Sequence, residues 1–334
     1  MMEHNFKYQI LIPDHITPPA DIEQEIFGPR SRVIAALAER EGQIPDEVWS
    51  ESDALIVYDN LRYEKGLLAK LKKCRVIVRA GIGYDNIDIE EAARRDMYVC
   101  NIPDYCTDEV ADHTIAFLLS IVRGFPGYQE RVRENKWDRK SGLTFRLKDK
   151  VMGMIGLGRI GSAAALRAKA FGMKIVFYDP YVKEGYDKVL GAERMDSLNH
   201  LARVSDVISV HTPLTGETYE MLDEDFFSNV KKGAVFINTA RGPVVKLNAL
   251  ENAMKDNIVR ASGLDVFSVE PPDDTQSLFV DYKNREEWLE GRLIISPHSA
   301  YHSPEGMREL RTKAAFEAKR VLDGEKPRNW VNEW

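Results

Sequence analysis

The strongest constraint on the fold of this chain is a glycine-rich turn placed between two short apolar runs. The turn reads Gly156-Leu157-Gly158-Arg159-Ile160-Gly161. Apolar residues 151–155 precede it, an alanine-rich segment at 162–171 follows it, and a second apolar run at 174–178 ends in Asp179. This order predicts one βαβ unit, whose glycines let the backbone turn tightly and approach a pyrophosphate at the helix N-terminus.

The acid at the end of the second strand indicates which dinucleotide this turn binds. A carboxylate there can hold both hydroxyls of the adenosine ribose, and it repels a 2′-phosphate. We therefore expect NAD rather than NADP as the cofactor. A glycine-rich turn in an unrelated α/β domain is the plainer alternative. The residues expected to bind the cofactor here are Gly156, Gly158, Arg159, Ile160, Gly161 and Asp179.

Length and composition limit the class of protein. A chain of 334 residues, 44% hydrophobic and 30% charged, predicts about two globular domains with a sizeable core. Its net charge of −7, without a long basic block, argues against a nucleic-acid partner. The apolar runs are too short to span a membrane, and residues 1–9 contain no signal-peptide core, so we expect a cytoplasmic protein. Three cysteines at these spacings predict neither full disulfide pairing nor a metal site.

Short strands and helices alternate along the first hundred residues. We expect strands at 8–12, 54–57, 75–78 and 97–101, and helices at 31–40, 66–71 and 89–95. A long apolar helix follows at 110–123, for which Thr107 is a suitable N-cap, and then a polar stretch at 128–150.

The remaining pattern completes the predicted fold. Strands at 206–210, 234–238, 261–264 and 293–295, added to the two of the βαβ unit, give the six strands of a doubly wound sheet. The polar segment 270–292 is expected to be a loop that contains one helical turn, and 304–322 an amphipathic helix that returns to the first domain. We therefore predict an α/β protein with two Rossmann-like, doubly wound parallel-sheet domains. The smaller, discontinuous substrate domain is 1–104 plus 302–334, and the dinucleotide-binding domain is 105–301.

Three clusters of polar residues follow predicted strands of the second domain. They are Asn238-Thr239-Ala240-Arg241-Gly242, then Gly263-Leu264-Asp265-Val266-Phe267 with Glu270-Pro271 beyond it, and Ser296-Pro297-His298. Ligands of open α/β sheets bind beyond the carboxyl ends of the strands, so these side chains are expected to converge. An arginine can grip a carboxylate, a histidine can give or take an alcohol proton, and a neighbouring carboxylate favours the imidazolium. Each residue alone has a plainer interpretation as a surface ion-pair partner, a helix cap or a turn residue.

Taken together, these motifs resemble those of the D-isomer-specific 2-hydroxyacid dehydrogenases over nearly the whole chain. The similarity rests on the clusters above, on the glycine-rich turn and on two further runs. These runs are Arg79-Ala80-Gly81-Ile82-Gly83-Tyr84-Asp85-Asn86-Ile87-Asp88 and Val210-His211-Thr212-Pro213-Leu214-Thr215.

The resemblance implies roles for individual residues. Arg241 is expected to bind substrate, Glu270 to pair with the catalytic His298, and Asp265 to contact the nicotinamide amide. Backbone amides of Ile82 and Gly83 are expected to hold the substrate carboxylate from the other domain. The remaining cofactor contacts implied are Thr212 and Pro213 at the adenine, Thr239 and Ala240 under the nicotinamide ribose, and Val110 near the nicotinamide. The resemblance also implies a homodimer formed through the nucleotide domains.

Two stretches, 100–114 and 297–301, look most like the branch of the C-terminal-binding corepressors and their bacterial relatives. There a tryptophan that contacts bound keto acid stands at the position of Tyr301, which makes Tyr301 a candidate substrate residue; a packing aromatic is the alternative. Lys246 replaces a common acidic residue and is expected to be solvated. The segment 281–290 resembles an insertion.

The function predicted from the sequence is NAD-dependent interconversion of a D-2-hydroxy acid and its 2-keto acid by hydride transfer at C2. One alternative is an NAD(H)-sensing interaction protein with little dehydrogenase activity, as in the corepressors. Another is oxidation of an unusual donor such as a phosphonate, a phosphite or a sugar acid. The substrate stays open among small 2-keto acids, with the pocket expected near 58–61, Tyr105 and Tyr301.

Overall fold

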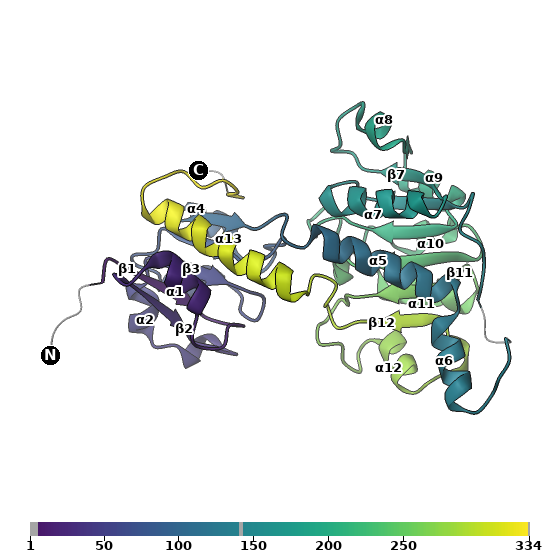
Figure 1. Ribbon diagram of the computed structural model, residues 1–334, viewed down its shortest axis with the longest axis horizontal. Coiled ribbons are helices and arrows are strands. Elements are labelled where there is room, and N and C mark those ends of the chain that lie inside the picture. Colours follow the sequence, from purple (N-terminus) through teal and green to yellow (C-terminus); the bar gives the residue numbers. More distant parts are fainter. Residues whose placement is uncertain (1–5, 140–142, 333–334) are drawn as a thin grey trace. The chain divides into compact units, whose positions relative to one another are not determined.

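The structure is a computed structural model that describes residues 6–139 and 143–332. The chain divides into two units, one running to Tyr105 and resuming at Ser303, the other extending from Cys106 to His302. Both units are built on a parallel sheet with helices on its two faces (Figure 1). The predicted fold class, α/β with two Rossmann-like domains, is therefore confirmed.

The first unit has a five-stranded sheet in the order β2-β1-β3-β4-β5, and all its paired strands are parallel. The strands are β1 (Tyr8–Ile12), β2 (Ser31–Ala35), β3 (Ala54–Val57), β4 (Val76–Arg79) and β5 (Tyr98–Asn101). The helices are α1 (Asp21–Phe27), α2 (Asp46–Glu51), α3 (Lys65–Leu68), α4 (Ile89–Ala93) and α13 (Pro304–Leu322). Helices α1 and α13 pack together, and α13 packs on β3 and β4. The other face is filled by the fully buried Trp49 and the leucines of α3.

The predicted helix at 31–40 is wrong, because its first half is strand β2. Residues Ser31–Ala35 pair in parallel with β1, and Ser31 is buried. The alanines of this stretch favour a helix, but the β-branched Val33 and Ile34 suit the sheet, and pairing with β1 outweighs the weak local preference.

The second unit has a seven-stranded parallel sheet in the order β12-β11-β10-β9-β6-β7-β8. The strands are β6 (Val151–Ile155), β7 (Lys174–Tyr178), β8 (Glu193–Arg194), β9 (Val207–Val210), β10 (Ala234–Asn238), β11 (Val259–Leu264) and β12 (Leu293–Ile295). The predicted six strands are all present, and the two-residue edge strand β8 is an addition.

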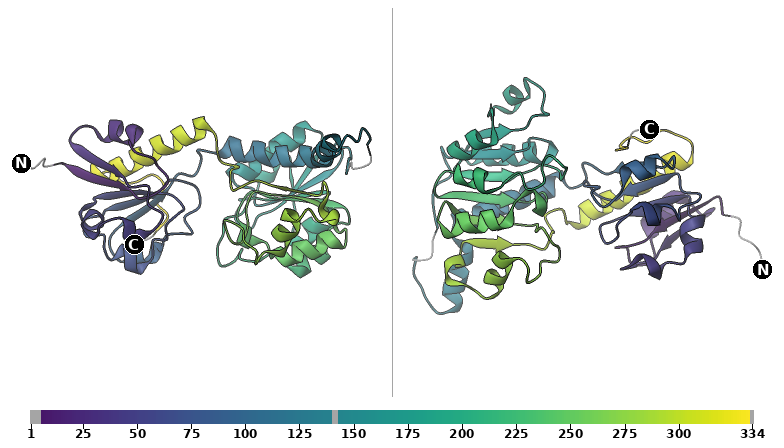
Figure 2. Two further views of the ribbon diagram at one scale, coloured as in Figure 1. Left: turned by 90° about the horizontal axis from the view of Figure 1, so that it is seen from below. Right: turned by 180° about the vertical axis from the view of Figure 1, so that it is seen from behind.

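Helices cover both faces of this second sheet. Helices α5 (Thr107–Val122) and α7 (Arg159–Ala170) pack against each other on one face. The opposite face carries α9 (Leu198–Val204), α10 (Glu224–Ser228) and α11 (Leu247–Lys255), as the left view of Figure 2 shows. The remaining helices are α6 (Phe125–Arg133), α8 (Tyr186–Leu190) and α12 (Ser277–Lys283). No helix among the described residues combines the length and the apolar character needed to cross a bilayer.

Two local predictions need correction in this unit. Thr107 lies inside α5, and Cys106 is the N-cap. The polar stretch at 128–150 begins within α6, and its residues 140–142 lie outside the described residues. The segment 270–292 contains α12 and a 3-10 helix at Glu287–Leu289, because Leu278 and Leu289 bury themselves in the core beside α11.

Candidate active site

Apart from Val110 on α5, the candidate residues of the second unit follow the carboxyl ends of parallel strands, at one edge of the sheet. The glycine turn follows β6, Asp179 follows β7 and Thr212 lies just beyond β9. Arg241, Asp265 and His298 come after β10, β11 and β12. Six segments far apart in the sequence therefore contribute to this edge, where open α/β sheets bind ligands.

The glycine turn has the geometry that a dinucleotide requires. Gly156 adopts φ +91°, and a Cβ there would lie 2.7 Å from the carbonyl oxygen of His211. A Cβ at Gly161 would collide with the carbonyl oxygen of Gly156, so this glycine lets α7 begin against the turn. Gly158, by contrast, is exposed and has no atom within 4 Å of where its Cβ would lie. The open face at Gly158, next to the N-terminus of α7, is where a pyrophosphate fits.

Asp179 links the turn to the segment beyond β7. One carboxylate oxygen accepts the backbone N–H of Leu157 at 2.8 Å, and the other accepts those of Tyr181 and Val182 at 2.9 and 3.2 Å. These bonds hold the carboxylate at the lip of the turn, as recognition of a ribose diol requires. Within the described residues, the buried hydroxyl of Thr212 has no hydrogen-bond partner, which leaves it available to a bound cofactor.

Helix α5 is tied to the end of β10 by two threonines. The hydroxyl of Thr114 donates to the carbonyl oxygen of Val110 at 2.9 Å and lies 3.0 Å from the hydroxyl of Thr239. Val110 and Thr239, which sequence reasoning places at the nicotinamide end of the cofactor, are thus brought together. Ala240 is fixed by its backbone N–H, which donates to the Asn238 side chain at 3.0 Å.

His298 and Glu270 form a direct pair. Nδ1 of His298 lies 2.6 Å from Oε2 of Glu270, and Oε1 accepts the backbone N–H of Phe267 at 2.8 Å. About a third of each side chain is exposed, 33% for His298 and 34% for Glu270. Because Nδ1 is engaged by the carboxylate, Nε2 is the nitrogen left to exchange a proton with a ligand. The ring of Tyr301 stands edge-on to His298, with centroids 6.2 Å apart.

The segment that carries Arg241 is anchored next to that pair. A Cβ at Gly242 would overlap the backbone of Phe267, so the two segments touch directly. Phe267 in turn binds Glu270. Arg241 donates to the carbonyl oxygen of Ala240 at 2.9 Å, and its own carbonyl accepts from the Asn238 amide at 3.0 Å. Close backbone packing therefore sets the position of the arginine.

Asp265 is the most buried acid of the group, at 2% exposure. Its carboxylate accepts the backbone N–H groups of Ser299 and Ala300 at 2.9 and 3.0 Å, and the Ser296 hydroxyl at 2.5 Å. Sequence reasoning placed Asp265 at the nicotinamide amide; the structure gives it contacts to the loop that bears His298. Ser296 and His113, which lies 2.9 Å from it, had no role in the sequence interpretation, because only the fold brings them together.

In the first unit, two side chains fix the turn that contains Ile82 and Gly83. The Asn101 side chain donates to the carbonyl oxygen of Ile82 at 2.7 Å, and the Arg79 side chain occupies the space where Gly81 would carry a Cβ. Among the described residues, no acceptor meets the backbone N–H of Ile82 or Gly83. Two adjacent free N–H groups on a fixed turn suit a carboxylate.

Three further sequence predictions fall outside these clusters. The carbonyl oxygen of Pro213 accepts from Thr218 at 2.7 Å on the exposed loop after β9. Lys246, expected to be solvated, is partly exposed and pairs with Glu224 at 2.8 Å. The described His, Cys, Asp and Glu side chains form no group of three or more that could hold a metal ion.

This geometry defines a dinucleotide-binding α/β protein with a histidine–glutamate pair at the cofactor edge of its sheet. The family model described as the D-isomer-specific 2-hydroxyacid dehydrogenase NAD-binding domain matches residues 115–300. D-3-phosphoglycerate dehydrogenase of Methanocaldococcus jannaschii is 36% identical over 282 residues, which cover 84% of this chain and 52% of that protein. Glyoxylate reductase of Thermococcus litoralis is 40% identical over 292 residues, 84% of each chain.

A solved structure extends the similarity to both units. D-lactate dehydrogenase of Aquifex aeolicus, solved with NAD and lactic acid, gives a TM-score of 0.83 at 28% identity, covering 97% of this chain and 99% of that one. The chain spans about half the length of the phosphoglycerate dehydrogenase it matches. It belongs to the D-isomer-specific 2-hydroxyacid dehydrogenase family, as its motifs predict, and its cofactor is NAD.

Proposed function

We propose that the protein is an NAD-dependent D-2-hydroxyacid dehydrogenase that interconverts a small 2-hydroxy acid and its 2-keto acid. The observation that carries this proposal is the His298–Glu270 pair, 2.6 Å apart, on the same edge of the sheet as the glycine turn. A proton donor beside a bound nicotinamide is what carbonyl reduction needs, since the cofactor delivers only hydride.

Each residue has a defined task in the reducing direction. His298 donates its Nε2 proton to the carbonyl oxygen, and Glu270 stabilises the imidazolium through Nδ1. Arg241 grips the substrate carboxylate or polarises the carbonyl, because its planar guanidinium can bind two oxygens at once. The backbone N–H groups of Ile82 and Gly83 bind the carboxylate, and Tyr301 borders the substrate beside His298. When bound, the nicotinamide supplies the hydride that reaches C2.

A preference for NAD over NADP follows from two carboxylates beside the adenosine position. Asp179 is fixed at the lip of the turn by three backbone N–H groups. Glu217 accepts a hydrogen bond from the hydroxyl of Tyr181, two residues beyond Asp179. A 2′-phosphate would meet negative charge on both segments, which supports NAD as the preferred cofactor.

The test is NADH oxidation by the purified protein with a panel of 2-keto acids, including glyoxylate, hydroxypyruvate, pyruvate and longer analogues. The proposal predicts turnover with at least one member above about 1 s⁻¹, the lower end of ordinary enzyme rates. Tight NADH binding without turnover on any member would contradict it and favour an NAD(H)-sensing interaction protein. NAD reduction in the presence of phosphonates, phosphite or sugar acids tests whether the protein oxidises one of these unusual donors.

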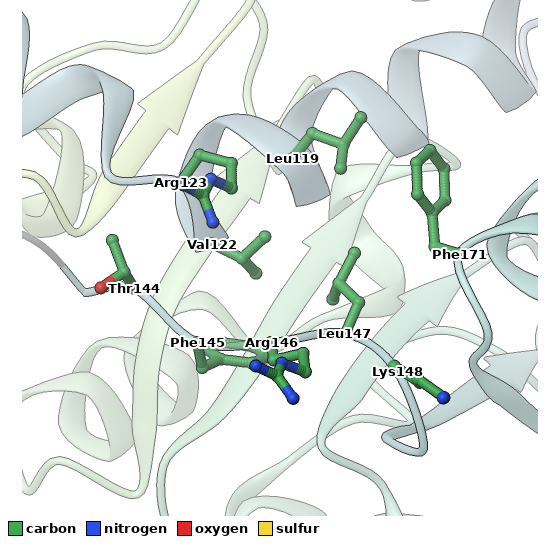
Figure 3. A pocket seen from close by; sticks show the side chains of 9 residues that line it. All are labelled: Leu119, Val122, Arg123, Thr144, Phe145, Arg146, Leu147, Lys148 and Phe171. Carbon is green, nitrogen blue, oxygen red and sulfur yellow. The ribbon is translucent and has the colours of Figure 1, made fainter.

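A homodimer through the nucleotide unit is the second part of the proposal. Three large apolar side chains on and beyond α6 are exposed: Phe125 at 56%, Val132 at 51% and Trp137 at 91%. Exposed apolar residues that occur together in this way are typical of an interaction surface. Nearby, a hollow of about 510 Å³ is lined by apolar side chains from the end of α5, from 144–148 and from Phe171, together with Thr144 and three basic side chains, Arg123, Arg146 and Lys148 (Figure 3). A second copy of the chain, which presents the same apolar surface, fits this face.

Solution mass by light scattering tests the dimer. The wild type is expected to run as a dimer, and Trp137→Glu together with Phe125→Asp as a monomer with the same far-UV spectrum. A wild-type monomer at micromolar concentration would overturn this part and leave the catalytic proposal intact.

A further inference from the structure

The backbone at His298 adopts a conformation that its surroundings must hold. His298 has φ +49°, in the left-handed region that residues with a Cβ rarely occupy. Its backbone N–H donates to the carbonyl oxygen of Asp265 at 2.8 Å. This turn directs the imidazole toward Glu270, so whatever holds the turn also sets the direction of the imidazole.

The carboxylate of Asp265 is the main support of the turn. It binds the residue two before His298 through the Ser296 hydroxyl, and the two residues after it through the N–H groups of Ser299 and Ala300. A buried carboxylate satisfied on several sides is rigid, because each lost bond would leave charge without a partner in an apolar environment. The orientation of the Ser296 hydroxyl therefore matters for the whole loop.

His113 determines that orientation from helix α5. Its Nε2 lies 2.9 Å from Oγ of Ser296 and 4.0 Å from Oδ1 of Asp265. Since the Ser296 hydroxyl donates to Asp265, its oxygen can only accept from His113, which must carry its proton on Nε2. Burial lowers the pKa of His113 despite the attraction of Asp265, which favours the neutral ring. The ring also packs edge-on against Phe117, with centroids 4.6 Å apart, which fixes its plane.

We propose that His113 is a positioning residue for the reaction: it orients the Ser296 hydroxyl on Asp265, and Asp265 holds the left-handed turn that presents His298. The proposal rests on the proposed function, because it concerns the proton donor of that reaction. It connects the helix bearing Val110 to the loop bearing His298 through three side chains, those of His113, Ser296 and Asp265, none of which needs to touch the substrate. Asp265 is buried, the His113 side chain is 26% exposed, and the network lies wholly within the second unit.

Two pairs of variants test the chain of contacts. Ser296→Ala removes the shared hydroxyl, and Ser296→Thr keeps it. His113→Phe removes the donor, and His113→Gln keeps an N–H at similar reach. Ser205→Ala is the control, since Ser205 is a buried serine whose hydroxyl donates one hydrogen bond at 2.7 Å to the carbonyl oxygen of Leu201, and it lies before β9 at the opposite edge of the sheet.

Two readouts separate positioning from simple loss of stability. The first is steady-state kinetics with NADH affinity measured in parallel by fluorescence. The second is the low-field proton resonance of His298 Nδ1, which a short charge-assisted hydrogen bond to Glu270 produces even without substrate. We expect Ser296→Ala and His113→Phe to lower kcat at least about tenfold, because small misplacements of a reacting group are costly. Their KM and NADH affinity should change less than about threefold, and the low-field resonance should shift or broaden.

The conservative variants and the control complete the test. Ser296→Thr, His113→Gln and Ser205→Ala should keep kcat within about threefold of the wild type and retain the resonance. Full turnover and an unchanged resonance in Ser296→Ala and His113→Phe would overturn the proposal. If the wild type turns over no keto acid, the proposed function fails, while the resonance still decides whether His113 and Ser296 set the geometry of His298.

Discussion

The glycine turn and the histidine turn lie at the same edge of one sheet, but they are constructed differently. The glycine turn depends on backbone shape: Gly156 and Gly161 allow close approach, and Gly158 leaves open space. The histidine turn depends on side chains from distant segments, with Asp265 holding a residue at φ +49°. Cofactor binding therefore depends on the absence of side-chain atoms at the glycines. Proton transfer depends instead on neighbouring side chains that hold His298 in a disfavoured backbone conformation.

Removing the imidazole should give the largest effect and separate the two regions. His298→Ala is expected to lower kcat about 10²- to 10⁴-fold, the usual contribution of a positioned acid or base. NADH affinity should stay within about twofold, because the glycine turn does not depend on this side chain. Stopped-flow turnover and NADH fluorescence measure both quantities, with His200→Ala on the exposed part of α9 as the control. Loss of NADH binding by a folded His298→Ala protein would show that the two regions are not separate.

The glycine turn can be broken in two distinguishable ways. Gly158→Ala places a methyl group where the protein has no neighbour, so the free energy of unfolding should change by less than about 0.5 kcal/mol. NADH affinity should nevertheless fall about fiftyfold, because the methyl group occupies the pyrophosphate position. Gly161→Ala collides with Gly156 and should also cost about 1–3 kcal/mol of stability. Chemical denaturation and NADH titration of both variants check this; unchanged affinity in Gly158→Ala would place the cofactor elsewhere.

Acidic pH should lower the stability of the protein through His211, which lies next to the glycine turn. Desolvation lowers the pKa of His211 to about 4, below the ordinary value of 6.5. Below pH 6.5, His211 is therefore protonated in the unfolded chain but stays neutral in the folded protein. The free energy of unfolding consequently falls as the pH drops toward 4. We expect His211 to account for about 1–2 kcal/mol of the loss between pH 6.5 and 5. Denaturation curves at both pH values should show a smaller loss in His211→Gln than in wild type or His200→Gln; equal losses would refute the assignment.

The smallest effect on NADH affinity is expected from Asp179, the predicted ribose contact. Asp179→Asn keeps one acceptor oxygen but loses the charge, so NADH affinity should fall about tenfold and the preference over NADPH should narrow. Binding constants for both cofactors, with Asp187→Asn on the exposed α8 as the control, provide the comparison. An unchanged ratio would mean that Asp179 does not face the ribose.

The same comparison explains what could be predicted from the sequence. The glycine turn is local: strand, turn, helix and acid occur in order, so the βαβ unit and its cofactor follow from residues 151–179. The clusters around Arg241, Glu270 and His298 were visible because they end predicted strands. The contact of His113 with Ser296 was not, because a histidine in an apolar helix carries no mark of its partner. Strand β2 was missed for a related reason, since its pairing with β1 depends on tertiary structure.

The most direct test of the account is transfer of deuterium to a 2-keto acid such as pyruvate from NADH that carries deuterium at both C4 positions of the nicotinamide. The account predicts the D-2-hydroxy acid with deuterium at C2 from the wild type, and labelled product formed at least about a hundredfold more slowly by His298→Ala at saturating NADH. Product without deuterium, the L isomer, or equal rates from the two proteins would contradict the central claim that His298 donates the proton beside a cofactor held by the glycine turn.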